Sequence, residues 1–294
     1  MNRAFATASL VLPAPAKLNL FLHILGRRPD GYHQLQTLFQ LLDYGDELEL
    51  SATLDGALEI TVEPALPDVP MTANLAYRAA LALRQHRPGP EGARVLLRKR
   101  LPLGGGLGGG SSDAATVLVG LNRLWGLDLG VTELCAIGLS LGADVPAFIQ
   151  GRTAWGEGIG EQLTPLDLPP AWYLVLKPDC NVATAAVFAH PELTRHTRAM
   201  KIRAFSGEGA TNDCQSVVET MYPQVREARL WLARYAQPRL TGTGACLFAR
   251  FPDRESAQAT LTEVPAAWSG FVAQGVNISP LHSPPLDQAW QPII

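Results

Sequence analysis

The feature that most constrains this chain is a group of six glycines within the seven positions 104–110, directly ahead of an apolar segment. Glycine has no side chain to keep another molecule away from the backbone. Ser111 and Ser112 follow the last glycine, and the run 114–119 then reads as the beginning of a buried helix. Backbone N–H groups ahead of a helix N-terminus bind phosphate oxygens. The stretch therefore predicts a loop that holds the phosphates of a nucleotide.

The residues alone leave three other interpretations of this glycine loop open. Gly104, Gly106 and Gly109 match G-x-G-x-x-G, the dinucleotide fingerprint, but such a unit normally opens a domain, and about a hundred residues come first here. A Walker A loop needs a lysine after its last glycine, where Ser111 follows Gly110. The third interpretation is a flexible hinge, although hinges rarely have an apolar helix directly behind them.

Three segments resemble the motifs of the GHMP small-molecule kinases, the superfamily of galactokinase, homoserine kinase and mevalonate kinase. The central segment is the glycine loop at 102–112, and the others are PAKLNL at 15–20 and LTGTGAC at 240–246. They occur in the right order and extend over nearly the whole chain. The resemblance implies an α+β fold of two domains, ribosomal-S5-domain-2-like at the N-terminus and ferredoxin-like at the C-terminus. The active site is expected in the cleft between them.

The proline-rich segment 163–170 marks the predicted domain boundary, with one domain at 1–165 and the other at 166–294. A chain of 294 residues fits two modest domains better than one large domain. After the boundary, the order of predicted strands and helices indicates helices layered on one antiparallel sheet. Both predicted halves are therefore α+β.

Composition argues against several classes of function. A formal net charge of −3 disfavours non-specific binding to nucleic acid, which needs a broad basic surface. No apolar run reaches the roughly 20 residues of a membrane helix. The four cysteines include no C-x-x-C pair, so neither a zinc site nor a disulfide framework is indicated. We expect a cytoplasmic monomer or weak homodimer that binds neither nucleic acid nor membrane.

Residues 16–25 alternate between two faces, as a β-strand does, with Lys17 and Asn19 on the face opposite a row of leucines. By itself this pattern fits an ordinary edge strand with a solvated lysine. The family resemblance instead implies that Lys17 lies near the transferred phosphate and that Asn19 contacts the substrate.

Asp144 follows a predicted helix at 132–141 that ends at Gly142. From its surroundings alone this aspartate could be a simple turn former. The resemblance implies that it is the catalytic residue, which orients the acceptor hydroxyl and takes its proton, while Lys17 stabilises the developing charge.

The turn at 26–31 is followed at once by Tyr32 and His33, which could simply close a hairpin. However, DGYH at 30–33 and the segment 41–46 resemble one branch of the GHMP kinases. Members of that branch phosphorylate the 2-hydroxyl of 4-diphosphocytidyl-2-C-methyl-D-erythritol in the non-mevalonate route to isoprenoid precursors. Cytosine needs an aromatic face and polar contacts at its edge. The resemblance gives the face to Tyr32 and the polar contacts to His33.

Further substrate residues follow from the same resemblance. Phe188 matches a second aromatic residue of the cytosine site, with Thr184 nearby, although the family often has proline where this chain has Ala185. Thr241 and Gly242 belong to a glycine-bearing turn that could be only a tight turn. In the family this turn faces the substrate and the site of phosphate transfer.

On the nucleotide side, Asn74 reads as the N-cap of a helix that runs to about His86, and the family places this turn near the nucleotide. Lys99 follows a predicted strand at 94–97 and could be solvated, whereas the family suggests that it touches the nucleotide. The other predicted ATP ligands form the glycine loop, namely Pro102, Leu103, Gly104, Gly105, Gly106, Leu107, Gly108, Gly109, Gly110, Ser111 and Ser112.

The resemblance implies ATP as the phosphate donor, together with Mg²⁺. Ser111 and Ser112 are natural partners for phosphate oxygens or for this ion, but the sequence does not identify the metal ligands. Asp113 is interpreted as a helix cap behind the loop, because a negative charge suits the first turn of a helix. Glu157 and Glu161 lie in a predicted turn and are left outside the site.

Two alternative functions fit the same motifs. One is another GHMP kinase, acting on homoserine, mevalonate or a sugar. The other is a nucleotide-binding protein without catalysis, which the presence of both Lys17 and Asp144 disfavours.

Overall fold

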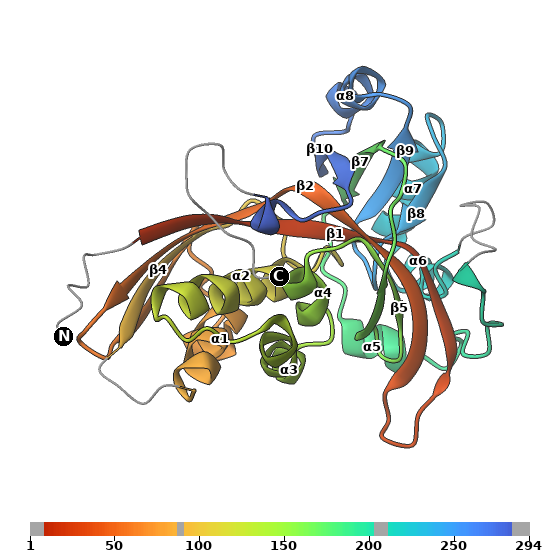
Figure 1. Cartoon of the computed structure of the whole chain (residues 1–294). Coiled ribbons are helices and arrows are strands. Elements are labelled where there is room, and N and C mark those ends of the chain that lie inside the picture. The colour runs from red at the N-terminus through yellow and green to blue at the C-terminus, as the bar shows by residue number, and fades with distance from the viewer. Residues whose placement is uncertain (1–8, 87–90, 203–210, 284–294) are drawn as a thin grey trace.

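The computed structural model describes residues 9–86, 91–202 and 211–283. Its central feature is a long antiparallel ribbon of two strands, β1 (Ser9–Arg27) and β2 (His33–Thr53), which runs through the molecule in Figure 1. Three irregularities in the pairing, the first between Pro15 and Lys17, bend the ribbon and turn its side chains. The ribbon therefore reaches both halves of the molecule.

The ribbon is part of one ten-stranded sheet with the order β3-β4-β2-β10-β7-β9-β8 along its main path. Besides β1, β5 also pairs with β2, and β6 pairs with β5. The last strand, β10, returns from the C-terminal half to pair with Leu41 and Leu42 of β2. The other strands are β3 (Leu58–Glu63), β4 (Gly92–Arg98), β5 (Ala154–Glu157), β6 (Gln162–Pro165), β7 (Ala171–Lys177), β8 (Pro238–Leu240), β9 (Leu247–Phe251) and β10 (Ser269–Val276).

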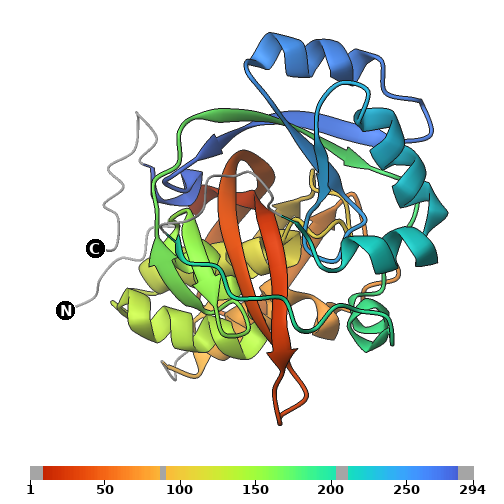
Figure 2. The same ribbon diagram turned by 90° about the vertical axis from the view of Figure 1, so that its right-hand side faces the viewer.

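Helices cover the sheet in two groups, which lie on either side of the ribbon in Figures 1 and 2. The N-terminal group contains η1 (Met71–Ala73), α1 (Leu75–Arg84), α2 (Gly109–Leu124), α3 (Val131–Leu141) and α4 (Val145–Gln150). The C-terminal group contains α5 (Thr184–Ala189), α6 (Gln215–Met221), α7 (Pro223–Leu232) and α8 (Arg254–Thr262), whereas η3 (Pro280–His282) returns to the N-terminal half, where Leu281 joins the core. No helix in the described part of the chain has the length and apolar character needed to cross a membrane.

Helix α2 is the central helix of the N-terminal half, because every residue from 112 to 122 is buried. It packs against β1 and β2 closely enough that Leu12 and Leu50 lie within about 3.3 Å of the position a Cβ would take on Gly120. Beyond its C-terminal end, the Trp125 indole donates a hydrogen bond of 3.1 Å to the Gly92 carbonyl. A helix buried on all sides is held rigidly, so the loop ahead of it has a fixed support.

Most of the elements expected from the sequence are present. The predicted strand at 16–25 is the middle of β1, and the predicted helices at 132–141 and near Ser256 are α3 and α8. Helix α2 begins at Gly109, ahead of the predicted run 114–119, so Gly109 and Gly110 belong to its first turn. Strand β9 begins only at Leu247, because the residues before it form a turn, and α4 was not predicted. The domain boundary near residue 165 stays a prediction.

Candidate active site

A cleft of about 320 Å³ lies where the β1–β2 ribbon, the glycine loop and the turn at 241–245 meet. It collects residues that are far apart in the sequence and that come from all three predicted motifs. The lining residues are Lys17, Asn19, Leu22, Leu35, Thr37, Phe39, Gly106, Gly108, Ser111, Ala143, Asp144, Ile159, Gly160, Thr184, Phe188, Gly242 and Thr243.

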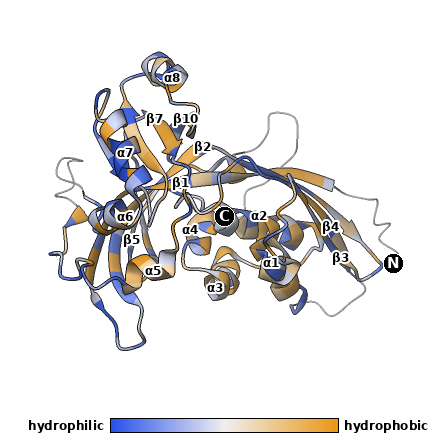
Figure 3. Cartoon of the chain, turned by 180° about the vertical axis from the view of Figure 1, so that it is seen from behind, coloured by the Kyte–Doolittle hydropathy of each residue, from blue (hydrophilic) through white to orange (hydrophobic). Residues whose placement is uncertain are grey.

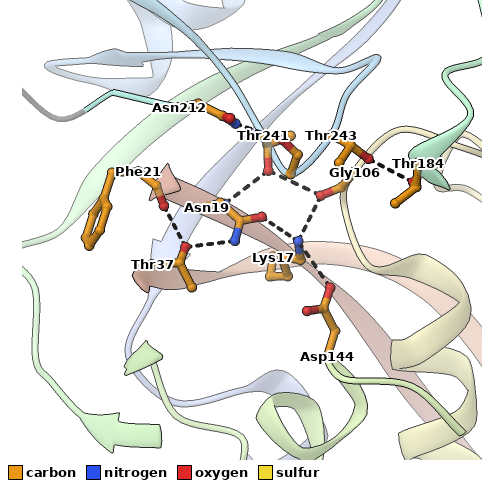
Figure 4. Close-up of polar contacts among 11 residues, drawn as sticks. Lys17, Asn19, Phe21, Thr37, Gly106, Asp144, Thr184, Asn212, Thr241 and Thr243 are labelled. Atoms are coloured by element: carbon orange, nitrogen blue, oxygen red, sulfur yellow. Dashed lines mark hydrogen bonds and ion pairs between the residues drawn. The ribbon is translucent and has the colours of Figure 1, made fainter. Parts of the chain in front are cut away.

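Lys17 lies at the base of this cleft with 3% of its surface exposed. Its ammonium has three donors and faces three oxygen acceptors: Asn19 Oδ1 at 2.6 Å, the Gly106 carbonyl at 3.0 Å and Asp144 Oδ2 at 3.3 Å (Figure 4). The ring centroid of Phe39 lies 5.5 Å from Nζ, within the range of a cation–π contact. A buried ammonium requires such partners, and losing one costs about 3–5 kcal/mol.

Asp144 differs from Lys17 in its exposure, because 31% of its side chain remains accessible. It lies just ahead of α4, whose first residues are buried, and after Gly142, which ends α3 as predicted. The carboxylate thus combines a fixed cationic neighbour with access to the cleft. A carboxylate placed in this way can accept a proton from a bound alcohol.

Asn19 has a single defined orientation. Its side-chain oxygen accepts from the ammonium of Lys17, and its Nδ2 donates to Thr37 Oγ1 at 2.8 Å. The Thr37 hydroxyl in turn donates to the Phe21 carbonyl at 2.6 Å. Swapping the amide oxygen and nitrogen would place two donors against each other at Lys17. The network therefore orients the acceptor of Asn19 toward the ammonium.

Thr241 links β1 to the glycine loop from a fully buried position. Its hydroxyl accepts from the Asn19 backbone N–H at 3.0 Å and donates to the Gly106 carbonyl at 3.2 Å (Figure 4). The Asn212 amide donates to the carbonyls of Leu240 and Gly242 on either side. Gly242 lines the cleft, whereas Thr241 lies beneath it, and their substrate contacts stay predictions.

The glycine loop is held from two sides by backbone hydrogen bonds. On one side β1 donates to the loop, and on the other side the residues just after the 241–244 turn do. The bonds run from Lys17 N to Leu107 O at 3.0 Å, from Ala245 N to Gly104 O at 3.0 Å, and from Cys246 N to Gly105 O at 3.1 Å. The loop is therefore fixed, which contradicts the hinge interpretation.

Glycine is required at two positions of the loop. Gly106 has a φ of +73°, and a Cβ there would lie 2.1 Å from the Thr241 carbonyl oxygen. Gly108 has a φ of +74°, and its Cβ would lie 2.7 Å from the ring of Phe148. Side chains rarely adopt such positive φ angles, and no side chain fits in so little space.

Gly108 is also the N-cap residue of α2, and it has no side chain to accept from the first N–H groups of the helix. These groups have no acceptor within the helix and are suited to bind phosphate oxygens. Ser111, in the first turn, lines the cleft, whereas Ser112 is fully buried. No described residue hydrogen-bonds the Ser112 hydroxyl.

Lys99 is enclosed rather than facing the cleft. Its side chain is 7% exposed, and its ammonium donates to the carboxylates of Asp46 and Asp113, the latter at 2.7 Å. Asp46 also accepts from the backbone N–H groups of Arg100 at 2.5 Å and Leu101 at 2.8 Å. This buried charged group therefore joins the ribbon, the start of the glycine loop and α2. Contact of Lys99 with a nucleotide stays a prediction.

The interpretation of Asp113 as a helix cap is wrong. Gly108 is the N-cap of α2, and the Asp113 carboxylate binds Lys99 instead, because burial makes this cation the strongest available partner. Burial also raises the pKa of Asp113 to about 7, against the opposing effect of Lys99. Its second oxygen, Oδ1, accepts no hydrogen bond from the described residues.

Asn74 caps α1 as predicted, accepting from the backbone N–H groups of Ala76 at 2.9 Å and Tyr77 at 3.4 Å. The next residue, Leu75, lies 3.5 Å from the position a Cβ would take on Gly110. The start of α1 is therefore beside the glycine loop, and the predicted contact of Asn74 with the nucleotide remains untested. Of the loop's first residues, Pro102 lies outside the cleft and Leu103 is exposed.

At the far end of the cleft, the rings of His33 and Phe188 are stacked, with centroids 5.0 Å apart and planes at 24°. Tyr32 is 62% exposed at the tip of the β1–β2 hairpin, which is hydrophilic in Figure 3. Thr184 shares a hydrogen bond of 2.8 Å with Thr243. In this structure His33, rather than Tyr32, faces the Phe188 ring, and the cytosine contacts of all these residues stay predictions.

Several residues of the site have no counterpart among those predicted. Thr37 and Phe39 alternate on β2, where they pair with Leu22 and Asn19 of β1, and the period of two within the apolar run 35–42 could have revealed them. Asn212 lies at the start of a segment that reads as helical and Arg195 lies in a segment without a pattern, so no sequence signal assigns either one to the site. In the described residues no cluster of three or more histidine, cysteine or acidic side chains could hold a metal ion.

This arrangement matches a known class of proteins. The family model described as the GHMP kinases N terminal domain matches residues 74–152, and the model for the GHMP kinases C terminal matches residues 190–270. The homoserine kinase of Cytophaga hutchinsonii has the same fold, with a TM-score of 0.62, 16% identity, and coverage of 95% of this chain and 98% of that one. The fold and the site thus define a small-molecule kinase of the GHMP class.

More similar proteins narrow this class. The 4-diphosphocytidyl-2-C-methyl-D-erythritol kinase of Ectopseudomonas mendocina is 55% identical over 277 residues, which cover 94% of each chain. That of Pseudomonas aeruginosa is 53% identical and covers 93% of this chain and 96% of its own. A crystal structure of 4-(cytidine 5'-diphospho)-2C-methyl-D-erythritol kinase, 33% identical, matches 91% of this chain and 100% of its own with a TM-score of 0.79. The chain belongs to the 4-diphosphocytidyl-2-C-methyl-D-erythritol kinase family.

Proposed function

We propose that this chain transfers the γ-phosphate of ATP to the 2-hydroxyl of 4-diphosphocytidyl-2-C-methyl-D-erythritol, in the non-mevalonate synthesis of isoprenoid precursors. The observation that carries the proposal is the Lys17–Asp144 pair, 3.3 Å apart beneath a rigid phosphate loop. This pair occurs in a chain that is 55% identical to a kinase named for that substrate. A cytoplasmic location and a monomeric or weakly dimeric state stay predictions.

The reaction requires a base, a charge stabiliser and a fixed donor. Asp144 Oδ2 takes the proton of the attacking hydroxyl, while its partner Lys17 balances the negative charge that develops on the transferred phosphoryl group. The Asn19 oxygen and the Gly106 carbonyl hold the ammonium in place, so it need not move during the reaction. The first N–H groups of α2 bind the phosphates of the donor.

Magnesium binding fits the oxygen donors of this cleft. Mg²⁺ in kinases is commonly held by one or two protein oxygens together with the phosphates of the nucleotide. The hydroxyl of Ser111 and the carboxylate of Asp144 both line the cleft, and the buried Ser112 hydroxyl has no acceptor or donor among the described residues. When bound, the ion would neutralise phosphate charge. Ser111 is the residue that would hold it, together with the phosphates of the nucleotide.

Glu157 and Glu161 are less suited to this ion, because both carboxylates already accept hydrogen bonds. Glu157 accepts from the Gln36 side chain at 2.9 Å, and Glu161 accepts from the Ile159 backbone N–H at 2.6 Å. Leaving them outside the proposed site is consistent with these contacts.

The proposal is tested by measuring ADP release with Mg-ATP and each of four acceptors: 4-diphosphocytidyl-2-C-methyl-D-erythritol, homoserine, mevalonate and galactose. Turnover only with the first acceptor is expected. Turnover with one of the others, and none with the first, would overturn the proposed substrate while retaining the kinase class. ATP binding without turnover on any acceptor would favour a nucleotide-binding protein without catalysis.

A further inference from the structure

Arg195 makes hydrogen bonds to two separate parts of the molecule beside Phe188, which lines one end of the cleft. On its own side its guanidinium donates to three backbone carbonyls: those of Phe188 at 2.9 Å, His190 at 2.8 Å and Leu193 at 3.0 Å. Toward the β1–β2 hairpin, its Nε donates to Nε2 of His33 on β2 at 3.2 Å. One side chain thus joins the segment after α5 to the start of β2.

The fourth hydrogen bond determines where the proton of His33 lies. A guanidinium is a donor only, so Nε2 must accept, and the single proton of a neutral imidazole must then be on Nδ1. A protonated imidazole would place two donors against each other. Consistently, burial first, and then the charges of Arg195 and Arg27, lower the pKa of His33.

Arg195 also restrains the plane of the ring. It binds the carbonyl of Phe188, and the His33 ring is stacked on the ring of that same residue. His33 is only partly buried, and no described residue hydrogen-bonds its Nδ1. The histidine is therefore held on one side, with one donor left for a ligand.

We propose that Arg195 is a positioning residue that presents His33 to the substrate as a fixed Nδ1–H donor, and thereby favours cytosine over uracil. This inference rests on the proposed function, which brings a cytidine group to this end of the cleft. Cytosine has an acceptor at ring position N3, whereas uracil has an N–H donor there. A histidine free to exchange tautomers could serve either base, but one fixed by Arg195 can pair only with the acceptor.

The tautomer is tested first, by ¹⁵N NMR of the histidine-labelled enzyme without ligand, with His33→Gln to assign the signal. The expected result is the Nδ1–H tautomer and a pKa below the ordinary value of 6.5. In Arg195→Met the pKa should rise toward that value, and the Nε2–H form should appear. An Nε2–H tautomer in the unsubstituted enzyme would overturn the inference, whatever substrate the enzyme uses.

Selectivity is tested by competition against the substrate at saturating Mg-ATP, with CDP and UDP as inhibitors. The ratio of the two inhibition constants should fall about tenfold in Arg195→Met. The substrate KM should rise, while kcat changes much less. Arg195→Lys keeps the positive charge but cannot make all four hydrogen bonds. Its ratio of inhibition constants should therefore lie between those of the unsubstituted enzyme and Arg195→Met, which separates the effect of charge from that of orientation.

A fall in kcat with an unchanged CDP/UDP ratio would mean that Arg195 only supports the fold, and would overturn the inference. Failure of the proposed function gives a different pattern. In that case the acceptor panel shows no turnover with the cytidyl substrate, whereas the tautomer measured without ligand stays Nδ1–H.

Discussion

The two ends of the cleft are built differently. At the phosphate end, Lys17 and Thr241 are almost fully buried, and every donor of the ammonium has an oxygen acceptor. At the base end, Tyr32 is largely exposed, and His33 is held from one side by Arg195. The end where, under the proposed function, charge develops is thus preorganised, as electrostatic catalysis requires. At the other end, the proposed contacts to the base include one largely exposed side chain, Tyr32.

The largest effect is expected at the preorganised end. Asp144→Asn removes the proton acceptor but keeps the shape, so kcat should fall about 10³-fold or more, with little change in either KM. ADP release at saturating substrates measures this. Asp167→Asn, at an exposed surface ion pair with Arg152, is the matched control and should retain normal turnover. Near-normal turnover in Asp144→Asn would show that the base is elsewhere.

The rigidity of the phosphate loop is tested by Gly106→Ala. The added methyl group would lie 2.1 Å from the Thr241 carbonyl, at a φ of +73°. The loop must shift, so kcat/KM for ATP should fall about 100-fold, because small displacements of catalytic groups are costly. Gly26→Ala, with nothing within 4 Å of its Cβ, is the control. A normal kcat/KM in Gly106→Ala would mean that the loop adapts, and would remove the contrast between the two ends.

At the adaptable end, Tyr32→Ala should raise the substrate KM about tenfold with kcat nearly intact, because stacking on a base is worth about 1–3 kcal/mol. Steady-state kinetics with varied cytidyl substrate measure the effect. Tyr235→Ala, which also removes a partly exposed tyrosine, should leave KM unchanged. An unchanged KM in Tyr32→Ala would remove the predicted stacking role and leave His33 and Phe188 as the aromatic contacts.

The smallest effect concerns the buried charges behind the loop. The pKa of Asp113 is raised to about 7 from 3.8, so between these values the folded chain retains a proton that the unfolded chain has released. Its contribution to the free energy of unfolding therefore falls as pH rises through this window. Residue 113 cannot titrate in Asp113→Asn. The free energy of unfolding of this variant should therefore fall less steeply with pH than that of the unsubstituted enzyme, by about 1 kcal/mol per pH unit.

Urea unfolding at about pH 5, 6 and 7 measures these slopes. Asp167→Asn, whose side chain is 71% exposed, serves as the control and should follow the unsubstituted enzyme. Parallel slopes for Asp113→Asn and the unsubstituted enzyme would mean that Asp113 is ionised throughout this range.

The sequence was most informative where the chemistry requires particular residue types close together. The glycine loop, and the alternation that places Lys17 beside Asn19, both appear in the structure as expected. The role of Asp113 was predicted wrongly because it depends on a distant residue. Its partner Lys99 is fourteen positions away and is buried together with Asp46, which lies on β2. Local patterns do not show which charges will share one interior.

Contacts made by irregular segments escaped prediction for a related reason. The bond of Arg195 to His33 spans 162 positions, and nothing periodic precedes or follows Arg195. Helix α4 was missed because its six residues are too few to show a helical period. The fold class was nevertheless predictable, because three motifs in a fixed order identify it more strongly than any single element.

The hydrogen bonds that Thr241 makes to the glycine loop and to β1 also have a consequence for the order in which the site forms. Thr241 binds Gly106 across 135 positions, and it binds Asn19 across 222. During synthesis on a ribosome the glycine loop emerges long before the residues that close over it. Contacts of such high sequence separation form late, because the entropy of closing the intervening chain must be overcome first. The nascent chain therefore completes the support of its glycine loop only after Thr241 has been synthesised.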